Sequence, residues 1–406
     1  MGLDLTQTYK QLENLTQRIE NTQEDRASRL SSALRMMCRA KPSCIQSKLR
    51  DSQGRAFLAA GVVEGLADKH AHINSPKNYC AISVDGSHID VDRHAPVRSY
   101  LINVGGCSLT YGSDPSARLF SQPYLYSEAS DRGGLYMANS ISGTREEIAI
   151  EGPIVGFKRA VEEVKGLAST VSEVQVEVPI LAMLDGSLVL WSLSGRGYPP
   201  FIRDEILGKG LLPALDSLKE IALNRTLTLI SYVSLPQSTE VVHALRFYLC
   251  PNTDVQCRQH CTVYRSTQDP CNTLNGILDR HLFQELLEPG ERSGLFFTNS
   301  SIVRNFYGVH WVYFYYINNG EEIARVELPE WVATNNVLLD LSHALIMDQC
   351  RRGNGYPAAI MEAHEQAVIT GTDRESFKLL MEEALTSRRL PVFTSEKNRS
   401  KRIRWL

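Results

Sequence analysis

Residues 81–87 read Ala-Ile-Ser-Val-Asp-Gly-Ser, an apolar run that stops at an acidic residue and a glycine. Such a run is typical of a buried strand that brings a carboxylate, here that of Asp85, to the edge of a sheet. The glycine lets the chain turn and lets a ligand approach the backbone closely. This stretch therefore predicts a sheet-centred fold with an acidic side chain at one edge of the sheet.

The same pattern occurs a second time. Residues 180–187 read Ile-Leu-Ala-Met-Leu-Asp-Gly-Ser, so Asp185 also ends an apolar run. Two carboxylates that come together repel each other unless a cation lies between them, and the usual cation is a divalent metal. The alternative interpretation is two unrelated turns, because Asp-Gly is a common turn dipeptide.

Hydrophobic periodicity outside these two stretches predicts an α/β protein with a mixed sheet. We expect strands at 79–84, 100–110, 179–184 continuing to 191, 227–233, 308–317 and 322–327, the last two forming a hairpin. We expect helices at 4–39, 55–67, 144–167, 201–206, 212–222, 240–248, 337–352, 357–369 and 373–386. The polar segment that ends at Gly143 is predicted to be an exposed excursion.

Three blocks in a fixed order resemble the NurA nuclease family. They are Val84-Asp85-Gly86-Ser87-His88-Ile89-Asp90 with Asp92-Arg93-His94, then Leu184-Asp185-Gly186-Ser187-Leu188, then Gly355-Tyr356-Pro357 followed by Glu362-Ala363-His364-Glu365. The resemblance runs from about residue 50 to the end of the chain. It implies an RNase H-like fold, a Mn²⁺-dependent 5′–3′ exonuclease and single-strand endonuclease, and a homodimer. It also implies a partnership with a hexameric HerA-type ATPase in DNA end processing for double-strand break repair.

The chain of 406 residues is long for one ordinary domain. We expect an N-terminal helical arm at 1–50, a NurA-like nuclease domain at 51–395 with a cysteine-bearing insertion at 250–271, and a basic tail at 396–406. The arm has apolar residues at helical spacing, namely Leu5, Tyr9, Leu12, Leu15 and Ile19. These side chains either pack on the core or form a dimer contact.

Phosphodiester hydrolysis requires an activated water and neutralisation of the charge that develops on the phosphate, and divalent ions held by carboxylates do both. Asp85 and Asp185 supply two carboxylates, which suit Mn²⁺ or Mg²⁺. A third should come from the helix between them, where the candidates are Glu147, Glu151, Glu162 and Glu163. We favour Glu163, which follows Arg159 by one helical turn, an arrangement that resembles the family pattern. The alternative is an ordinary solvated helix face.

His364 completes the predicted catalytic and metal-binding set of Asp85, Glu163, Asp185 and His364. A single helical histidine is more often structural than catalytic. The match to the Ala-His motif of the family implies that His364 is a metal ligand or a proton-transfer residue.

Cationic side chains beside the later aromatic strands are candidates for nucleic-acid binding. Arginines next to tyrosines could hold phosphates while the rings stack on the bases of a single strand. The candidates are Arg292, Arg304, His310 and Arg325. The alternative is that these aromatic strands pack in the core. The basic tail could bind DNA or an acidic partner, or remain solvated.

Four cysteines fall within one hydrophilic loop, namely Cys250, Cys257, Cys261 and Cys271. Clustered cysteines in a reducing compartment are typical of a Zn²⁺ site or an iron–sulfur cluster. The gaps between them do not match Cys-x-x-Cys, so unligated thiols are the alternative. This loop is not carried over from the family pattern.

The bulk composition narrows the class of protein. A hydrophobic content of 43% and a charged content of 22% are those of a soluble globular protein, and a formal charge of −3 does not predict a broad DNA-coating surface. No apolar run approaches the roughly 20 residues needed to span a bilayer, and the N-terminus does not resemble a signal peptide. We therefore expect a cytoplasmic protein. The alternative to a nuclease is a catalytically silent nucleic-acid-binding protein or ATPase adaptor on the same fold.

Overall fold

The computed structural model of the 406-residue chain describes residues 3–51, 57–91, 97–128, 134–139, 146–195, 197–251 and 270–390. The chain forms two compact units. The first unit comprises Met1–His72, Val233–Ser300 and Val312–Val326, and the second comprises Ile73–Tyr232, Ser301–Trp311 and Glu327–Leu406. The predicted division into arm, nuclease domain and tail stays a prediction, and the tail lies outside the described residues.

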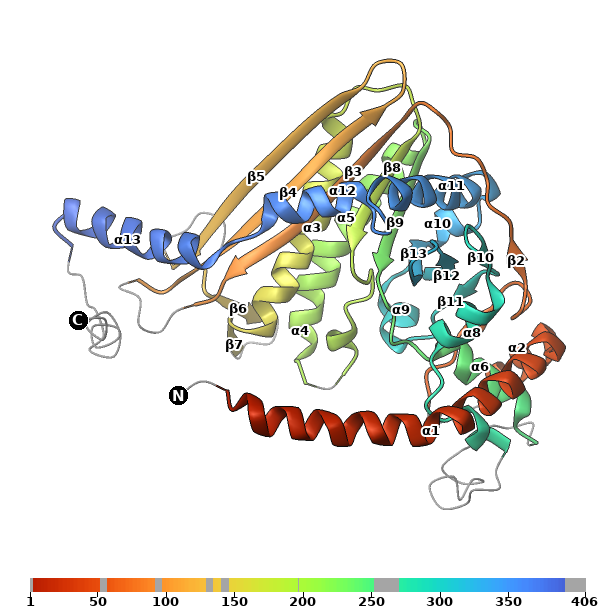
Figure 1. Ribbon diagram of the computed structural model, residues 1–406. Coiled ribbons are helices and arrows are strands. Elements are labelled where there is room, and N and C mark those ends of the chain that lie inside the picture. The colour runs from red at the N-terminus through yellow and green to blue at the C-terminus, as the bar shows by residue number, and fades with distance from the viewer. Residues whose placement is uncertain are drawn as a thin grey trace. The chain divides into compact units, whose positions relative to one another are not determined.

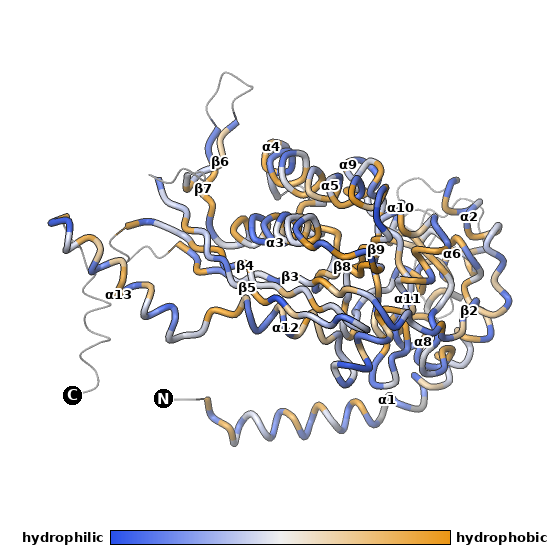
Figure 2. The backbone as a smooth tube through the Cα atoms, turned by 90° about the horizontal axis from the view of Figure 1, so that it is seen from above, coloured by the Kyte–Doolittle hydropathy of each residue, from blue (hydrophilic) through white to orange (hydrophobic). Residues whose placement is uncertain are grey.

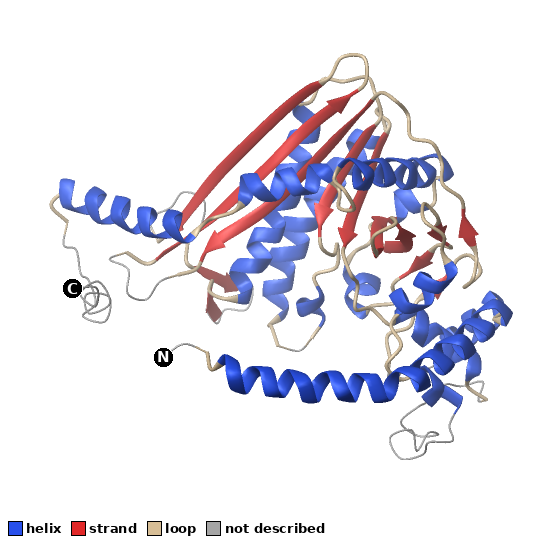
Figure 3. Ribbon diagram, viewed as in Figure 1, coloured by secondary structure: helices blue, strands red, loops and turns tan. Residues whose placement is uncertain are grey.

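Five neighbouring strands of an 11-stranded mixed sheet form the centre of the second unit (Figure 3). These strands are β3 (Tyr79–Ile89), β4 (Ser99–Tyr111), β5 (Ser116–Ser127), β8 (Ile180–Asp185) and β9 (Leu227–Val233). They lie in the order β9-β8-β3-β4-β5. β3, β4 and β5 are antiparallel, whereas β8 runs parallel to both β3 and β9. The antiparallel strands β3, β4 and β5 lie on one side of the sheet, and the parallel strands β8 and β9 follow on the other side of β3. This strand order is that of the predicted RNase H-like fold.

Helices cover both faces of this sheet. α3 (Pro153–Glu173) lies on one face and α12 (Ala358–Ala367) on the other (Figure 2). Glycines allow the close approach on each side: a Cβ on Gly166 of α3 would meet Val104 of β4, and one on Gly105 would meet the backbone of Ala367. The remaining elements are α4 (Pro200–Arg203), the π-helix η2 (Asp204–Leu211), α5 (Leu212–Ala222), α9 (Ser301–Phe306), α10 (Glu330–Ala333), α11 (Asn336–Arg352), α13 (Gly371–Ser387), the 3₁₀ helix η1 (Trp191–Ser194) and the hairpin β6 (Tyr136–Asn139) and β7 (Glu146–Ala149).

The sheet strands carry the apolar runs that the sequence contains. β8 buries Ile180 to Leu184, as is typical of a parallel strand covered on both faces, and then exposes Asp185. β5 is the last strand in the order and is largely exposed. The sequence predicted an exposed excursion here: the segment is exposed, but backbone pairing with β4 makes it a strand.

Three helix or strand predictions need correction. Residues 57–67 contain β1 (Gly61–Val62) and no helix among the described positions, whereas α2 (Pro42–Asp51) forms earlier. Residues 146–149 form β7 rather than helix, and α3 begins only at Pro153. The residue before it, Gly152, has a φ of 58°, a conformation that glycine adopts readily and that separates the strand from the helix. Residues 188–191 do not continue β8.

The first unit has its own hydrophobic core between helices and short strands (Figure 1). Its elements are α1 (Leu5–Arg39), α2, α6 (Glu240–Leu249), α8 (Asp279–Leu286), the 3₁₀ helix η3 (Pro270–Leu274), β1, β2 (Lys69–His70), β10 (Arg292–Ser293), β11 (Phe296–Phe297) and β12 (Val312–Asn318). β13 (Ile323–Pro329) begins in this unit and ends in the second. No helix among the described residues combines the length and apolar character needed to cross a bilayer.

The long helix α1 has two different halves. Asp4 caps its start by accepting hydrogen bonds from the backbone N–H groups of Thr6 and Gln7. Towards its end, Ala33 and Met37 are buried in the core of the first unit. Its N-terminal half instead exposes the predicted apolar stripe, Leu5, Tyr9, Leu12, Leu15 and Ile19.

Candidate active site

Asp85 and Asp185 lie on neighbouring parallel strands. Val84 of β3 is paired with Leu184 of β8, so each aspartate directly follows the same pair of residues. β8 ends at Asp185, whereas β3 continues to Ile89. The two aspartates therefore lie on adjacent strands at the position where β8 ends. Asp85 itself lies within β3, so the prediction that the chain turns at Gly86 was wrong.

Glu163 of α3 lies against Gly86 of β3. A Cβ on Gly86 would lie 2.6 Å from Oε1 of Glu163 and 2.9 Å from Cγ of Arg159. The glycine after Asp85 thus leaves the space that the Glu163 carboxylate occupies. Glu162, the competing candidate, instead pairs with Lys165 at 3.1 Å.

The electrostatic environment of Glu163 is unusual for a glutamate. Its side chain is 14% exposed and its Oε1 has no hydrogen-bond partner, although Nε of Arg159 lies 3.1 Å away. Burial raises its pKa from 4.5 to about 7; Arg159 opposes this shift, and the charges of Asp85 and Asp185 add to it. A raised carboxyl pKa caused by burial and like charges is typical of a functional site.

His364 contacts the first aspartate. Its Nδ1 lies 2.8 Å from Oδ2 of Asp85, and α12 carries it with Ala363 and Ala367 buried on the same helix. With the carboxylate as acceptor, Nδ1 donates its proton, and a neutral ring then has Nε2 as an acceptor. The His364 side chain is 58% exposed, so a ligand can reach the ring.

Tyr356 contacts the second aspartate, and the sequence did not predict this. Its hydroxyl donates a 2.8 Å hydrogen bond to Oδ1 of Asp185, while its ring stands perpendicular to that of Tyr232 on β9. Tyr356 belongs to the Gly355-Tyr356-Pro357 block of the family-like pattern, and no contact with Asp185 was predicted for it. The presence of Tyr356 in one of the three family-like blocks was the sequence signal that could have indicated a role at the site.

The donor set at this edge suits a hard divalent cation. Asp85, Glu163 and Asp185 supply carboxylate oxygens, and His364 could supply an imidazole nitrogen. Among the described residues, no three His, Cys, Asp or Glu side chains are already arranged to hold a metal. The carboxylates are engaged by Arg159, His364 and Tyr356. Oε1 of Glu163 already lies 3.1 Å from Nε of Arg159, so a bound cation would compete with this ion pair.

Comparison with known proteins agrees with the motif order. The sequence profile described as the NurA domain matches residues 81–369. The chain belongs to the NurA family. No curated protein sequence gives a significant match.

Several solved structures are similar to this one. The NurA nuclease from Sulfolobus solfataricus has 11% sequence identity and a TM-score of 0.48, over 96% of this chain and 98% of that chain. An Argonaute from Aquifex aeolicus has 9% identity and a TM-score of 0.26, over 72% and 28% of the two chains. LC9-RNase H1, a type 1 RNase H with the type 2 active-site motif, has 8% identity and a TM-score of 0.21, over 42% and 71%.

The predicted nucleic-acid-binding residues have mixed placements in this NurA-family chain. Arg292 and Arg325 are each 2% exposed and pair with Glu64 at 3.6 Å and with Glu240 at 2.9 Å. Their burial does not support a contact with DNA phosphates, and it agrees with the alternative that the aromatic strands pack in the core.

The other two candidates, His310 and Arg304, belong to the second unit. His310 is also 2% exposed and lies 2.8 Å from Asp216, which argues against a role in binding DNA. Arg304 of α9 is exposed, so it alone among the four candidates has a solvent-facing side chain.

The cysteine loop is only partly described. Cys257 and Cys261 lie outside the described residues, as do Asp92, Arg93 and His94 near the first motif. Cys250 is buried at the end of α6, where its backbone N–H bonds to the carbonyl of Arg246, and Cys271 Sγ lies 3.9 Å from the same carbonyl oxygen. The two ends of the loop therefore meet, and the metal site stays a prediction.

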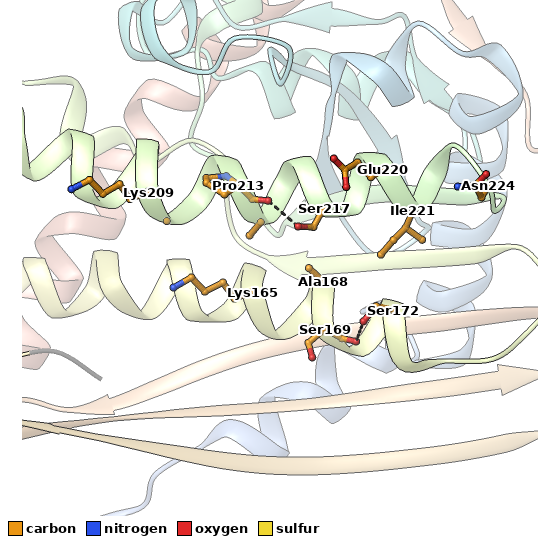
Figure 4. A pocket seen from close by; sticks show the side chains of 12 residues that line it. Lys165, Ala168, Ser169, Ser172, Lys209, Pro213, Ser217, Glu220, Ile221 and Asn224 are labelled. Carbon is orange, nitrogen blue, oxygen red and sulfur yellow. Dashed lines mark hydrogen bonds between the residues drawn. The ribbon is translucent and has the colours of Figure 1, made fainter. Parts of the chain in front are cut away.

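A groove of about 680 Å³ lies between α3 and α5 in the second unit (Figure 4). Its lysines, Lys165 and Lys209, are paired with Glu162 and Glu205. The hydroxyl of Ser217 bonds back to its own helix. None of the four predicted catalytic residues lines this groove, which is therefore separate from the carboxylate cluster.

Proposed function

We propose that this chain is a divalent-metal-dependent nuclease that hydrolyses phosphodiester bonds in DNA. The observation that carries the proposal is the strand pairing that sets Asp85 beside Asp185, together with the largely buried Glu163 carboxyl, whose pKa both of these charges raise. A fold that needed only stability would gain little from this arrangement, because like charges close together oppose folding. Membership of the NurA family supports the same function.

The metal would be held by Asp85, Glu163 and Asp185, with His364 as a further ligand or as a proton-transfer residue. When bound, Mn²⁺ or Mg²⁺ supplies an activated water and neutralises charge on the phosphate oxygens. Imidazole among the ligands favours Mn²⁺.

The residues of the chain contribute orientation and proton handling. Asp85 fixes the ring of His364 through Nδ1, which leaves Nε2 to accept a proton from a water molecule or to bind the metal. Tyr356 holds Oδ1 of Asp185 and so leaves Oδ2 for the cation. Arg159 offsets the charge of Glu163.

The finer parts of the proposal come from the family resemblance. They are 5′–3′ exonuclease and single-strand endonuclease activity in double-strand break repair, a HerA-like ATPase partner, and a homodimer in the cytoplasm. The exposed stripe of α1 supports a dimer contact, since Leu5, Leu12 and Ile19 repeat every seven residues, as along a coiled-coil seam.

Digestion of 5′-labelled linear DNA tests the proposal. The wild type should cleave with Mn²⁺ or Mg²⁺ and not with EDTA, and Asp85→Asn should lose activity. Asp114→Asn, an exposed aspartate in the turn after β4, is the matched control and should cleave normally. Full activity of Asp85→Asn would exclude the mechanism, and DNA binding without cleavage by the wild type would favour the silent adaptor.

A further inference from the structure

A buried carboxylate lies behind the turn that carries Asp185. Glu327, near the end of β13, is 1% exposed. Its Oε2 accepts hydrogen bonds from the hydroxyl of Ser187 at 2.8 Å and from the backbone N–H of Leu188 at 2.9 Å. Both donors belong to the turn that directly follows Asp185.

The turn after Asp185 lies outside the sheet, so strand pairing does not fix its conformation. β8 ends at Asp185, and Gly186 has a φ of 82°, a left-handed conformation that favours glycine. The backbone N–H of Gly186 still bonds to the carbonyl of Tyr232 at 2.9 Å. The N–H of Trp191 bonds to the carbonyl of Val189 at 2.9 Å, and side chains supply further bonds to the turn.

Ser187 and Tyr307 complete a network around Glu327. The hydroxyl of Ser187 donates to Glu327 and accepts from Nε1 of Trp191 at 3.0 Å and from the N–H of Val189 at 3.1 Å. The hydroxyl of Tyr307 accepts from the N–H of Leu190 at 3.0 Å and donates to the carbonyl of Leu188 at 3.1 Å. Every residue from Ser187 to Leu190 therefore has a side-chain partner for its backbone or hydroxyl.

A carboxylate is a costly way to fill a buried position, and an apolar side chain of similar volume is often at least as stabilising. What an apolar side chain cannot do is accept the two hydrogen bonds that define the turn. The position that the turn controls is that of Asp185, whose Oδ1 is already held by Tyr356.

We infer that Glu327 is a positioning residue for the metal site, acting on Asp185 through the hydrogen bonds that it accepts from Ser187 and Leu188. This inference rests on the proposed metal-dependent function. Residues that orient metal ligands typically change metal affinity by about 10- to 100-fold when they are replaced. Loss of the acceptor should therefore weaken metal binding without removing any proposed ligand.

The test compares Glu327→Met, which removes the acceptor at similar length, with Glu327→Gln, whose amide oxygen can accept both bonds. Mn²⁺ binding to the full chain is measured by electron paramagnetic resonance and by calorimetry, independently of cleavage. Glu327→Met should raise the Kd for Mn²⁺ about 10- to 100-fold, and Glu327→Gln should restore an affinity close to that of the wild type. Cleavage by Glu327→Met should recover when Mn²⁺ is raised.

Glu240→Met is the matched control, because Glu240 is also a buried glutamate but pairs with Arg325 in the first unit. It should lower thermal stability and leave the affinity for Mn²⁺ unchanged. A Glu327→Met variant that is folded and binds Mn²⁺ as tightly as the wild type overturns the inference.

Ser187→Ala keeps the inference testable if Glu327→Met does not fold. It removes one of the two donors and should raise the Kd for Mn²⁺ several-fold, to about tenfold; an unchanged Kd overturns the inference. A wild type that fails to bind Mn²⁺ overturns the proposed function as well. A wild type that binds Mn²⁺, with the affinity unchanged in the variants, overturns only the role of Glu327.

Discussion

Two carboxylates, Asp279 of the first unit and Glu163 of the second, lie in opposite kinds of environment. Asp279 in the first unit is 0% exposed and accepts hydrogen bonds from Ser238, Tyr316 and the N–H groups of Val241 and Val242 at the start of α6. Glu163 in the second unit has an Oε1 with no hydrogen-bond partner and a pKa raised to about 7.

The difference separates a structural acid from a candidate functional one. Donors from the chain satisfy Asp279, including first-turn N–H groups that favour a negative charge. Among the described residues, Glu163 has the ion pair with Arg159 and lies near two further carboxylates. A cation bound among the three carboxylates would offset their mutual repulsion.

The largest expected effect is a loss of DNA cleavage when Glu163 is replaced. Glu163→Gln should reduce cleavage by about 10³-fold, because a metal ligand supplies several kcal/mol of transition-state stabilisation. Its folding should be intact, since the amide removes a charge that burial disfavours. Single-turnover cleavage of labelled DNA measures the first effect, and thermal unfolding measures the second.

Glu162→Gln is the matched control for this prediction. It changes the adjacent glutamate of the same helix, which pairs with Lys165 rather than with the site. It should cleave within about twofold of the wild type, because its ion pair with Lys165 does not involve the proposed metal ligands. Equal losses in the two variants would contradict the assignment of Glu163.

Replacing Asp279 in the first unit should change stability rather than activity. Asp279→Ala should lower the free energy of unfolding by about 3 kcal/mol, because it leaves several buried donors without an acceptor. The folded fraction should cleave DNA normally. Chemical denaturation and cleavage per folded molecule check both statements; a cleavage defect larger than the loss of folded protein would break the comparison.

Gly86→Ala tests the position of the Glu163 carboxylate without changing its charge. The added Cβ would lie 2.6 Å from Oε1 of Glu163, so the carboxylate must move. Cleavage should fall by about 10²-fold, as is typical when a reacting group is misplaced by about 1 Å. Gly156→Ala on α3 meets nothing within 4 Å and should keep full activity. Equal activity of the two variants would mean that the closeness of Glu163 to β3 is unimportant.

The pH dependence of stability provides a smaller effect of known sign. The pKa of Glu163 in the folded chain, about 7, exceeds its ordinary value of 4.5, so folding favours the protonated form. In EDTA, the contribution of this group is fully present below pH 4.5 and is lost as the pH rises through 7. The wild type should therefore lose stability relative to Glu163→Gln across this interval. Denaturation at several pH values measures the difference, and a change of opposite sign would contradict the raised pKa.

Tyr356→Phe has the smallest expected effect. It removes one hydrogen bond to Asp185 and keeps the ring against Tyr232. Loss of a bond to a charged group should reduce cleavage at limiting Mn²⁺ by about tenfold. A titration of rate against Mn²⁺ should show a higher half-saturation concentration with a similar maximum rate. A lower maximum at saturating Mn²⁺ would assign Tyr356 a direct catalytic role.

The sequence predicted the elements whose apolar residues recur with a clear strand or helix period. The runs that end at Asp85 and Asp185 gave two neighbouring strands, and the stripe on α3 gave the helix that carries Glu163. β5 was missed because it is largely exposed and buries almost no side chain, so that backbone pairing with β4 is what reveals it. The helix predicted at 55–67 was wrong because Gly61 and Val62 pair with β11 instead.

The side-chain environment was the harder part to predict. The arginines near the aromatic strands looked like phosphate ligands, yet Arg325 lies over the ring of Phe314 at 3.5 Å and pairs with Glu240. Tyr356 and Glu327 act on Asp185 from positions far along the chain. Such contacts depend on tertiary packing, which local sequence patterns do not encode.

Anomalous diffraction at the manganese edge, from crystals of the full chain soaked in Mn²⁺, tests the central claim most directly. The account predicts a peak within coordination distance of Asp85, Glu163 and Asp185, and its absence in Glu163→Gln crystals. A wild-type map with no peak among these three carboxylates, in crystals of a protein that still cleaves DNA, would contradict the account.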